Sequence, residues 1–454
     1  MTKLNAPLYD AVTNYAAKAR FHMPGHGGTP IDGGLYLSAP FDITELPFSD
    51  NLKNPSGVIK DAERLFAETY SSEDALLFAT GATGAVQSAL YAARERFGKS
   101  AVIAPNCHCS VHSALRLFGM RSVVLGSNAR PMPKNRENRI DGDITPDAAA
   151  AVLDDTRAGI LVLTSPDYYG RALDLAGFKE VTESRGVCLV VDSAHGAHFA
   201  FSPLLPPPAS LYADLTVYGA HKTMPVFTGG AVLCGSADLI AKSRFYRSEY
   251  MTTSPNYVVL ASLDYARAYL SLNGRAAYEK VFTDILTFKR ALPQFTFTDN
   301  SDFTKLYFDC PADAPESAGV LPEMFDGSGS LLIVTPFNSD KLKYLADSLK
   351  TAAPLRIPSN ECPLTEAADI ICKNIAKAEA DREGNPTENV RNKSDLVEIE
   401  DAAGCVSEFD IGAYPPGVPR VLAGAVITDD DVIFMKKNKY RLFNLVKGKV
   451  CVII

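Results

Sequence analysis

Short apolar runs alternate with segments of helical periodicity through the first half of the 454-residue chain. Several runs are apolar at consecutive positions, which is typical of strands covered on both faces of a sheet. The segments 82–97 and 174–185 between them carry apolar residues at helical spacing. The alternation predicts an α/β fold with a mainly parallel sheet covered by helices. The predicted strands are 75–80, 101–105, 122–126, 159–165, 188–192, 214–219 and 230–235.

The pattern changes along the chain and predicts several parts. A Pro- and Gly-rich, irregular arm comes first, a long helical stretch lies near 256–270, and mixed strand and helix patterns return at 300–375. The tail KGKVCVII (447–454) alternates and is β-branched, which predicts a last strand. We expect an arm over 1–50, a large domain over 51–270, a small α/β domain over 271–377, a charged linker over 378–393 and a C-terminal domain over 394–454.

Composition places the chain among ordinary soluble globular proteins, with 46% hydrophobic and 22% charged residues. The 53 acidic residues exceed the 45 basic ones, which argues against a nucleic-acid or anionic-membrane partner. No apolar run is long enough to span a membrane, and the first residues lack the apolar core of a signal peptide. The nine cysteines form no CxxC, which favours free thiols over disulfides or a zinc ribbon. We therefore expect a cytoplasmic protein.

The histidines lie close together in the sequence, since all seven occur within the first 221 residues. His108 and His112 are four residues apart, as are His22 and His26, and two zinc ligands on one helix have the same spacing. Neither pair carries the glutamate of HExxH, and the flanking residues supply no carboxylate ligand. We therefore expect no metal site, and the grouping favours a shared site of another kind.

Polar residues follow the ends of several predicted strands. Asp192 ends the strand 188–192, His195 follows it directly, and Lys222 comes just after the strand 214–219. Ligands of open α/β sheets bind at the carboxyl ends of strands, so these side chains are expected to converge. The glycine-rich turn TGATG (80–84) joins a strand to a helix, where backbone N–H groups suit a phosphate. It matches neither the Walker motif nor GxGxxG.

A phosphate cup, an acid at a strand end, a histidine and a lysine are together the groups that pyridoxal phosphate needs. The lysine forms a Schiff base with the aldehyde of the cofactor. The acid keeps the pyridine nitrogen protonated, so that the ring accepts electrons, and a flat side chain stacks on the ring. The sequence therefore predicts pyridoxal 5'-phosphate as the cofactor.

Nine segments, in the same order, resemble motifs of the bacterial ornithine/lysine/arginine decarboxylases, which have the aspartate-aminotransferase-like fold type I. The resemblance covers most of the chain, and at 454 residues the chain resembles the short form without a wing domain. It implies a large domain that binds pyridoxal phosphate, a smaller α+β C-terminal region, and a carboxy-lyase that makes a polyamine or its precursor. The segments are FHMPGHGG (21–28), DITELPFSDNLKNPSGVIKDAE (42–63), TGATGA (80–85), NCHCSVHSAL (106–115), TSPDYYG (164–170), VDSAHGAHF (191–199), GAHKTMP (219–225), TTSPNYVVLASLDYAR (252–267) and AYPPGVPRVLAG (413–424).

The resemblance also implies roles for single residues. Lys222 is the Schiff-base lysine and proton shuttle, and Asp192 pairs with the pyridine nitrogen. His195 lies near the phenolic oxygen, and His108 stacks on the ring; with Lys222 and Asp192 they are the four predicted catalytic residues. The further predicted cofactor contacts are Gly81, Ala82 and Thr83 at the phosphate, His221 beside the lysine, and Ser254 with Thr253, which reach the cofactor or the partner's site across a homodimer.

The chain departs from the family pattern at four positions, one of which is Ser193, where the family motif DEAHGAH has glutamate. Gly27, Gly219 and Ala425 stand where the family has lysine, serine and glutamate, which puts the efficiency of the enzyme in question. A basic substrate also needs a carboxylate for its distal cation, because an unpaired buried charge is costly. No motif identifies this carboxylate, and Glu408 is the residue that we predict to supply it. The other candidate acids are Asp42, Glu45 and Asp50 in the arm and Asp410 near the C-terminus.

Two other function classes stay open at this point. One is a different pyridoxal-phosphate reaction of the aminotransferase or aldolase type, although no motif supplies the arginine that an aminotransferase needs. The other is a non-catalytic regulator that binds the cofactor or a polyamine, against which the retained Lys222 argues. The expected function is decarboxylation of arginine, lysine or ornithine by a homodimer or a multiple of it, with arginine or lysine first.

Overall fold

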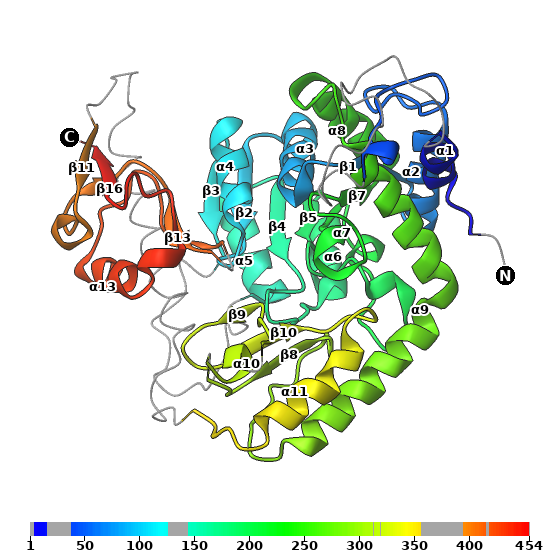
Figure 1. Cartoon of the computed structure of the whole chain (residues 1–454). Coiled ribbons are helices and arrows are strands. Elements are labelled where there is room, and N and C mark those ends of the chain that lie inside the picture. The colour runs from blue at the N-terminus through cyan, green and yellow to red at the C-terminus, as the bar shows by residue number, and fades with distance from the viewer. Residues whose placement is uncertain are drawn as a thin grey trace. The chain divides into compact units, whose positions relative to one another are not determined.

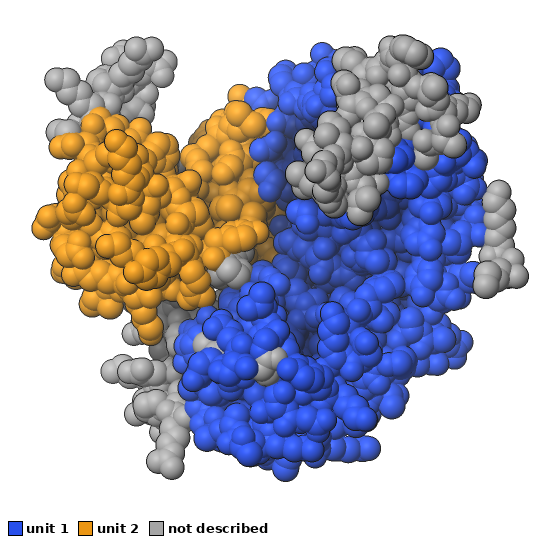
Figure 2. All heavy atoms as spheres, in the orientation of Figure 1, with its two compact units in different colours: residues 1–98, 165–356 blue, residues 99–164, 357–454 orange. Residues whose placement is uncertain are grey.

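The computed structural model describes residues 4–15, 38–125, 144–311, 313–317, 319–355, 394–414 and 417–453. It divides into two compact units, coloured separately in Figure 2. Unit 1 comprises residues 1–98 and 165–356, and unit 2 comprises residues 99–164 and 357–454. The predicted linker 378–393 and Gly27 lie outside the described residues.

A seven-stranded sheet, in the order β1-β7-β6-β5-β4-β2-β3, is the largest sheet among the described residues (Figure 1). The pairs β2–β3, β2–β4 and β5–β6 are parallel, whereas β7 runs antiparallel to both β6 and β1. All seven predicted strands belong to this sheet, which confirms the α/β fold with a mostly parallel sheet. The strands are β1 (Asp74–Phe78), β2 (Ser100–Ile103), β3 (Arg121–Val124), β4 (Ile160–Thr164), β5 (Cys188–Asp192), β6 (Leu215–Tyr218) and β7 (Ala231–Gly235).

Helices follow most of the strands, as the periodicity predicts. The strands β5, β6 and β7 are buried along their whole length, which explains why they read as unbroken apolar runs. No helix in the described ranges is long and apolar enough to cross a membrane. The helices of this part are α2 (Val58–Thr69), α3 (Gly81–Phe97), α6 (Leu175–Glu183), α7 (Ala220–Thr223) and α8 (Ala237–Tyr250) in unit 1, with α4 (Cys109–Leu117) and α5 (Pro146–Thr156) in unit 2.

The prediction of an irregular arm is wrong for the segment that forms α1 (Pro7–Tyr15). Leu8 and Val12, one helical turn apart, are buried in the core of unit 1. The carboxylate of Asp264 accepts a hydrogen bond from the N–H of Leu8 at 2.9 Å and so satisfies a free donor at the start of the helix. The Pro and Gly residues further along the arm hid this short amphipathic pattern.

The long helix α9 (Tyr257–Ala291) runs across the predicted boundary between residues 270 and 271. Its first half packs on α1 and α2, and its second half packs on α11, which lies alongside it in Figure 1. A small antiparallel sheet of order β8-β10-β9 completes this side of unit 1. Its elements are β8 (Lys305–Phe308), α10 (Asp313–Ser317), β9 (Met324–Phe325), β10 (Ser330–Ile333) and α11 (Leu342–Leu349).

The C-terminal region of unit 2 has a hydrophobic core of its own, which includes Ile411, Val432 and Val450. The predicted last strand is present as β16. Ala425, where the family has glutamate, is buried in this core, so a carboxylate there would lack water and a partner. The elements are β11 (Ser394–Val397), β12 (Val406–Ser407), β13 (Ile411–Ala413), β14 (Pro419–Val421), α13 (Asp429–Lys437), β15 (Leu442–Phe443) and β16 (Val450–Ile453).

Candidate functional site

Lys222 lies on the single helical turn α7, which follows the buried strand β6. Gly219, directly before this turn, packs against the loop that follows β5. A Cβ atom at position 219 would lie 2.8 Å from the carbonyl oxygen of Ala194. This close approach allows Nζ of Lys222 to lie 3.1 Å from Nε2 of His195. The glycine therefore has a packing role at the position where the family has serine.

We expect Gly219→Ser to lower the free energy of unfolding by about 1–3 kcal/mol, because the backbone oxygen of Ala194 cannot turn away as a flexible side chain would. The same substitution should separate His195 from Lys222 and reduce activity. Thermal or urea unfolding of the variant measures the first effect. A variant with wild-type stability and activity would show that position 219 tolerates a side chain.

His195 lies between two lysines of unit 1. Nζ of Lys222 is 3.1 Å from its Nε2, and Nζ of Lys305 is 2.9 Å from its Nδ1. The ring of Tyr168 packs edge-on against the imidazole, with 4.7 Å between the ring centroids. His195 and Lys305 are both buried. The structure thus brings two of the predicted residues together and adds a second lysine to them.

Sequence reasoning missed Lys305, which begins strand β8 and lies 110 residues from His195 in the chain. A lysine at the start of an apolar run such as KLYF is usually exposed at a strand end. Here its side chain is 1% exposed, and burial lowers the pKa of the amine to about 8. Nothing local in the sequence distinguishes this lysine from a surface one.

Asp192 is the last residue of β5 and is buried. One of its carboxylate oxygens accepts a hydrogen bond from the N–H of Ala194 at 3.1 Å. Its backbone oxygen accepts a hydrogen bond from the N–H of Ser165 at 3.1 Å, which joins the end of β5 to the loop after β4. The carboxylate therefore lies at the carboxyl end of a central strand, three residues before His195.

The predicted phosphate cup forms the start of α3. Gly81 has a φ of +73°, a left-handed conformation that glycine adopts without strain, and its N–H donates to the oxygen of Gly229 at 2.7 Å. Ala82 and Thr83 form the first turn of the helix. A Cβ atom at Gly84 would lie 2.3 Å from Oγ1 of Thr80, so a larger residue there would require the Thr80 side chain to move. Such a helix start offers backbone donors and a favourable dipole to an anion.

The other predicted cofactor contacts of unit 1 have different surroundings. Burial lowers the pKa of His221, and the ring Nδ1 lies 2.9 Å from the oxygen of Gly230. This places the proton of a neutral ring on Nδ1, from which it is donated to the oxygen, and ties α7 to the start of β7. Thr253 and Ser254 are exposed in the segment before α9.

Three predicted residues belong to unit 2 and are described within it. The Nδ1 of His108 accepts a hydrogen bond from the N–H of Ser110 at 3.1 Å, at the start of α4. The thiol of Cys451 donates to the carboxylate of Glu408 at 2.7 Å and lowers the pKa of that carboxyl group. Asp410 binds Arg116 through both oxygens, at 2.8 and 2.6 Å.

Asp50, one of the arm acids, has a structural task at the start of α2. Its carboxylate accepts hydrogen bonds from the N–H groups of Asn51, Gly57 and Ile59 at 2.8, 2.8 and 3.1 Å. Burial raises the pKa of this carboxyl group, but the backbone hydrogen bonds outweigh it and the net pKa is lowered. An acid that is used in this way has little capacity left for a substrate cation. The other arm acids, Asp42 and Glu45, are half-buried.

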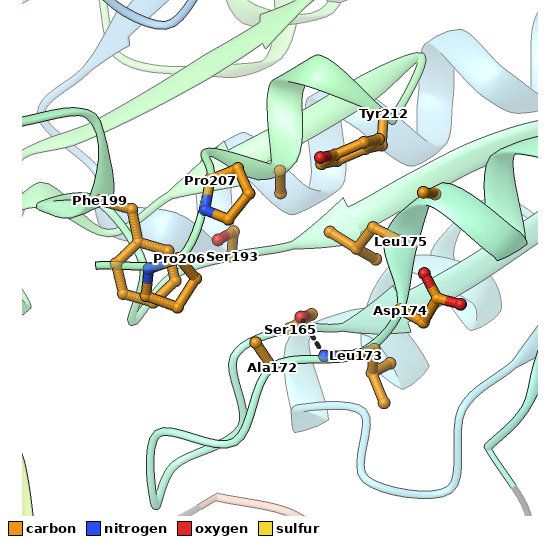
Figure 3. A pocket seen from close by; sticks show the side chains of 12 residues that line it. Ser165, Ala172, Leu173, Asp174, Leu175, Ser193, Phe199, Pro206, Pro207 and Tyr212 are labelled. Atoms are coloured by element: carbon orange, nitrogen blue, oxygen red, sulfur yellow. Dashed lines mark hydrogen bonds between the residues drawn. The ribbon is translucent and has the colours of Figure 1, made fainter. Parts of the chain in front are cut away.

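A pocket in unit 1 lies next to Asp192, because the neighbouring Ser193 is one of its lining residues. The loop after β4, the start of α6 and the segment 199–212 supply the others (Figure 3). At its edge, the hydroxyl of Ser165 accepts a hydrogen bond from the N–H of Leu173 at 3.0 Å. Lys222, Asp192 and His195 do not line this pocket. The lining residues are Ser165, Ala172, Leu173, Asp174, Leu175, Ala176, Ser193, Phe199, Pro206, Pro207, Ala209 and Tyr212.

Solved structures with the same fold include two bacterial lysine decarboxylases. Lysine decarboxylase A from Pseudomonas aeruginosa superposes with a TM-score of 0.73 over 99% of this chain and 80% of its own, at 16% identity. The lysine decarboxylase LdcF of Francisella novicida gives a TM-score of 0.71 over 100% of this chain and 82% of its own, also at 16% identity. At this identity the likeness shows the fold alone.

Sequence comparisons reach further. The chain is 30% identical to the uncharacterized protein YaaO of Bacillus subtilis (strain 168), over 94% of this chain and 93% of that protein. It is 27% identical to the arginine decarboxylase of Halalkalibacterium halodurans, over 95% of this chain and 93% of that protein. The profile of the family described as Orn/Lys/Arg decarboxylase, major domain, matches residues 6–309. The chain therefore belongs to the ornithine/lysine/arginine decarboxylase family, as its nine sequence segments predicted.

Proposed function

We propose that this protein decarboxylates arginine, with pyridoxal 5'-phosphate held by Lys222. Family membership makes the chain a decarboxylase of a basic amino acid. Arginine is favoured within that class because relatives named arginine decarboxylase align over nearly the whole chain, as in Bacillus subtilis over 96% of it. These findings favour decarboxylation over the aminotransferase, aldolase and regulator alternatives.

The residues of unit 1 fit the cofactor by their chemistry. Lys222 supplies an amine, Asp192 a buried acid at a strand end, and the start of α3 a set of backbone donors. The absence of a side chain at Gly84 leaves room for the hydroxyl of Thr80 beside the first turn of α3. When bound, pyridoxal phosphate supplies an aldehyde for an amine and a ring that takes up the electron pair released with carbon dioxide.

Each residue has a separate task in this proposal. The buried carboxylate of Asp192 holds the proton on the pyridine nitrogen, since a charged hydrogen bond is strong where water is excluded. Lys222 returns a proton to the substrate carbon that loses its carboxylate, and His195 exchanges protons with Lys222 across 3.1 Å. The N–H groups of Ala82 and Thr83 orient the cofactor through its phosphate.

The roles of His108, His221, Ser254 and Glu408 stay predictions. The carboxylate of Glu408 is engaged by the thiol of Cys451, so binding a substrate cation would compete with that contact. The proposed role of His221 is to hold the neighbouring Lys222 in place, because its ring is hydrogen-bonded to the oxygen of Gly230.

The substrate is tested by incubating the protein and pyridoxal phosphate separately with arginine, lysine and ornithine. Agmatine, cadaverine or putrescine is then measured together with carbon dioxide. We expect agmatine to form fastest with the wild-type protein, and far more slowly with Lys222→Ala. Faster formation of cadaverine or putrescine would contradict the choice of arginine. Turnover of only neutral or acidic amino acids would contradict a basic substrate altogether.

We further propose a cytoplasmic homodimer as the smallest active unit, with the arm and the segment 252–256 at its interface. The exposed Thr252, Thr253 and Ser254 support this placement, together with the family resemblance. Light scattering should give a mass of twice 48.9 kDa under assay conditions. A fully active monomer would contradict the proposal.

A further inference from the structure

His195 connects three separate segments of unit 1 through its two ring nitrogens. The imidazole comes from the loop after β5, Lys222 from α7 and Lys305 from the start of β8. The two amines lie 3.1 and 2.9 Å from Nε2 and Nδ1, within hydrogen-bond distance of the ring. Lys305 has no place in the proposed mechanism, yet it is the more deeply buried of the two lysines.

The number of protons in this arrangement is limited. A neutral imidazole has one N–H donor and one acceptor nitrogen, whereas a lysine ammonium can only donate. If both hydrogen bonds are kept, one amine donates to the ring and the other accepts from it. The accepting amine must be neutral. Two lysine ammonium groups are therefore incompatible with the observed contacts.

The charged groups around Lys305 decide which amine carries the proton. The carboxylates of Asp302, Glu323 and Asp167 favour the ammonium form of Lys305, and Lys222 disfavours it. Asp302 is fully buried, and although burial raises its pKa, His198 and Lys305 bring the net value below the usual one. The amine of Lys305 also lies 5.8 Å from the centre of the Tyr168 ring, where a cation is stabilised. The pKa of about 8 leaves Lys305 mostly protonated at neutral pH.

We propose that Lys305 is a positioning residue that donates to Nδ1 of His195, fixes the Nε2–H tautomer and so holds Lys222 as a neutral amine. This inference rests on the proposed role of Lys222 as the lysine that binds the cofactor. A neutral amine is the form that attacks an aldehyde, whereas an ordinary lysine, with a pKa of about 10.4, is almost fully protonated at neutral pH. Lys305 therefore prepares Lys222 for the cofactor before the cofactor arrives.

The first test uses the cofactor-free protein and compares wild type, Lys305→Met and Lys305→Arg. The rate at which acetic anhydride labels Lys222 is measured as a function of pH by mass spectrometry of the Lys222 peptide. With methionine at 305, Lys222 is expected to keep its proton and to react at least about tenfold more slowly near neutral pH, with recovery in alkali. Arginine at 305 should preserve the wild-type profile. Equal profiles for wild type and Lys305→Met would overturn the proposal.

Lys289→Met is the matched control, because the half-buried Lys289 pairs with Asp299 and makes no contact with His195, so its removal should leave the labelling of Lys222 unchanged. Thermal unfolding of each variant identifies one that has lost its fold. If a variant has lost its fold, the tautomer of His195 in the wild-type protein still tests the proposal. Nitrogen NMR of labelled histidine, assigned with His195→Gln, should show the proton on Nε2 and a bare Nδ1 at neutral pH. A proton on Nδ1 would overturn the proposal.

None of these measurements depends on turnover. Failure to decarboxylate arginine would contradict the proposed function and leave the tautomer and the labelling profile as they are. An active enzyme with cofactor on Lys222, but with labelling that does not respond to residue 305, would retain the function and reject the role of Lys305.

Discussion

Lys222→Ala is expected to lower the rate of decarboxylation by roughly 10³-fold or more, because the variant loses both the amine that holds the cofactor and the group that returns a proton. The fold should survive, since Lys222 is only half-buried and its turn is held by Gly219 and His221 through backbone and ring contacts. Single-turnover release of carbon dioxide, with saturating cofactor, measures the loss without interference from product release.

The control for this experiment is Lys289→Ala, which removes an amine that is paired with Asp299 on the surface. It should keep the wild-type rate. Added methylamine should restore part of the activity of Lys222→Ala, because a small amine can take over the proton transfer. A variant with more than about a tenth of the wild-type rate would mean that another group carries the proton.

Asp192→Asn is expected to lower kcat by about 10²-fold or more while the affinity for the cofactor changes much less. The amide keeps the shape of the carboxylate, and its oxygen can still accept from the N–H of Ala194. It no longer carries the charge that favours a protonated pyridine nitrogen. Turnover and cofactor affinity are measured on the same preparation.

Asp214 offers a matched control for Asp192. Asp214 stands directly before strand β6. Its carboxylate accepts a hydrogen bond from the N–H of Leu189 in β5 at 2.7 Å, and so acts as a cap. Asp214→Asn should therefore retain most of the activity. Similar, small losses in the two variants would show that Asp192 is also only a cap.

The large sheet was predictable because strands such as β5, β6 and β7 are buried along their whole length and so appear as short apolar runs in the sequence, whereas the strand β3 is only partly buried. The same rule does not apply to α1, whose two buried residues, Leu8 and Val12, stand in a segment followed by many prolines and glycines. The extent of α9 was also missed. Its second half buries Tyr278, Val281, Ile285 and Phe288 at spacings of three and four residues, so the helical pattern continued in the sequence beyond residue 270.

The proximity of Lys222 and His195 was predictable because each follows a strand of one parallel sheet, and the carboxyl ends of parallel strands lie at one edge. Lys305 comes from a different sheet, and its position depends on long-range packing that local patterns do not contain. The departures at Gly219 and Ala425 have a physical reason that the sequence alone does not give. At Gly219, the backbone of Ala194 lies too close for a serine side chain. At Ala425, the surrounding apolar core excludes the water that a glutamate needs.

We propose that Lys222, of all the lysines in the chain, binds pyridoxal phosphate. This proposal is tested most directly by borohydride reduction of the cofactor-loaded protein, followed by peptide mapping. We expect one pyridoxyl group per chain, on the peptide that contains Lys222, and none on the peptide that contains Lys305, although the two amines flank the same histidine. A label on Lys305 or on any other lysine, or no label at all, would contradict the proposal.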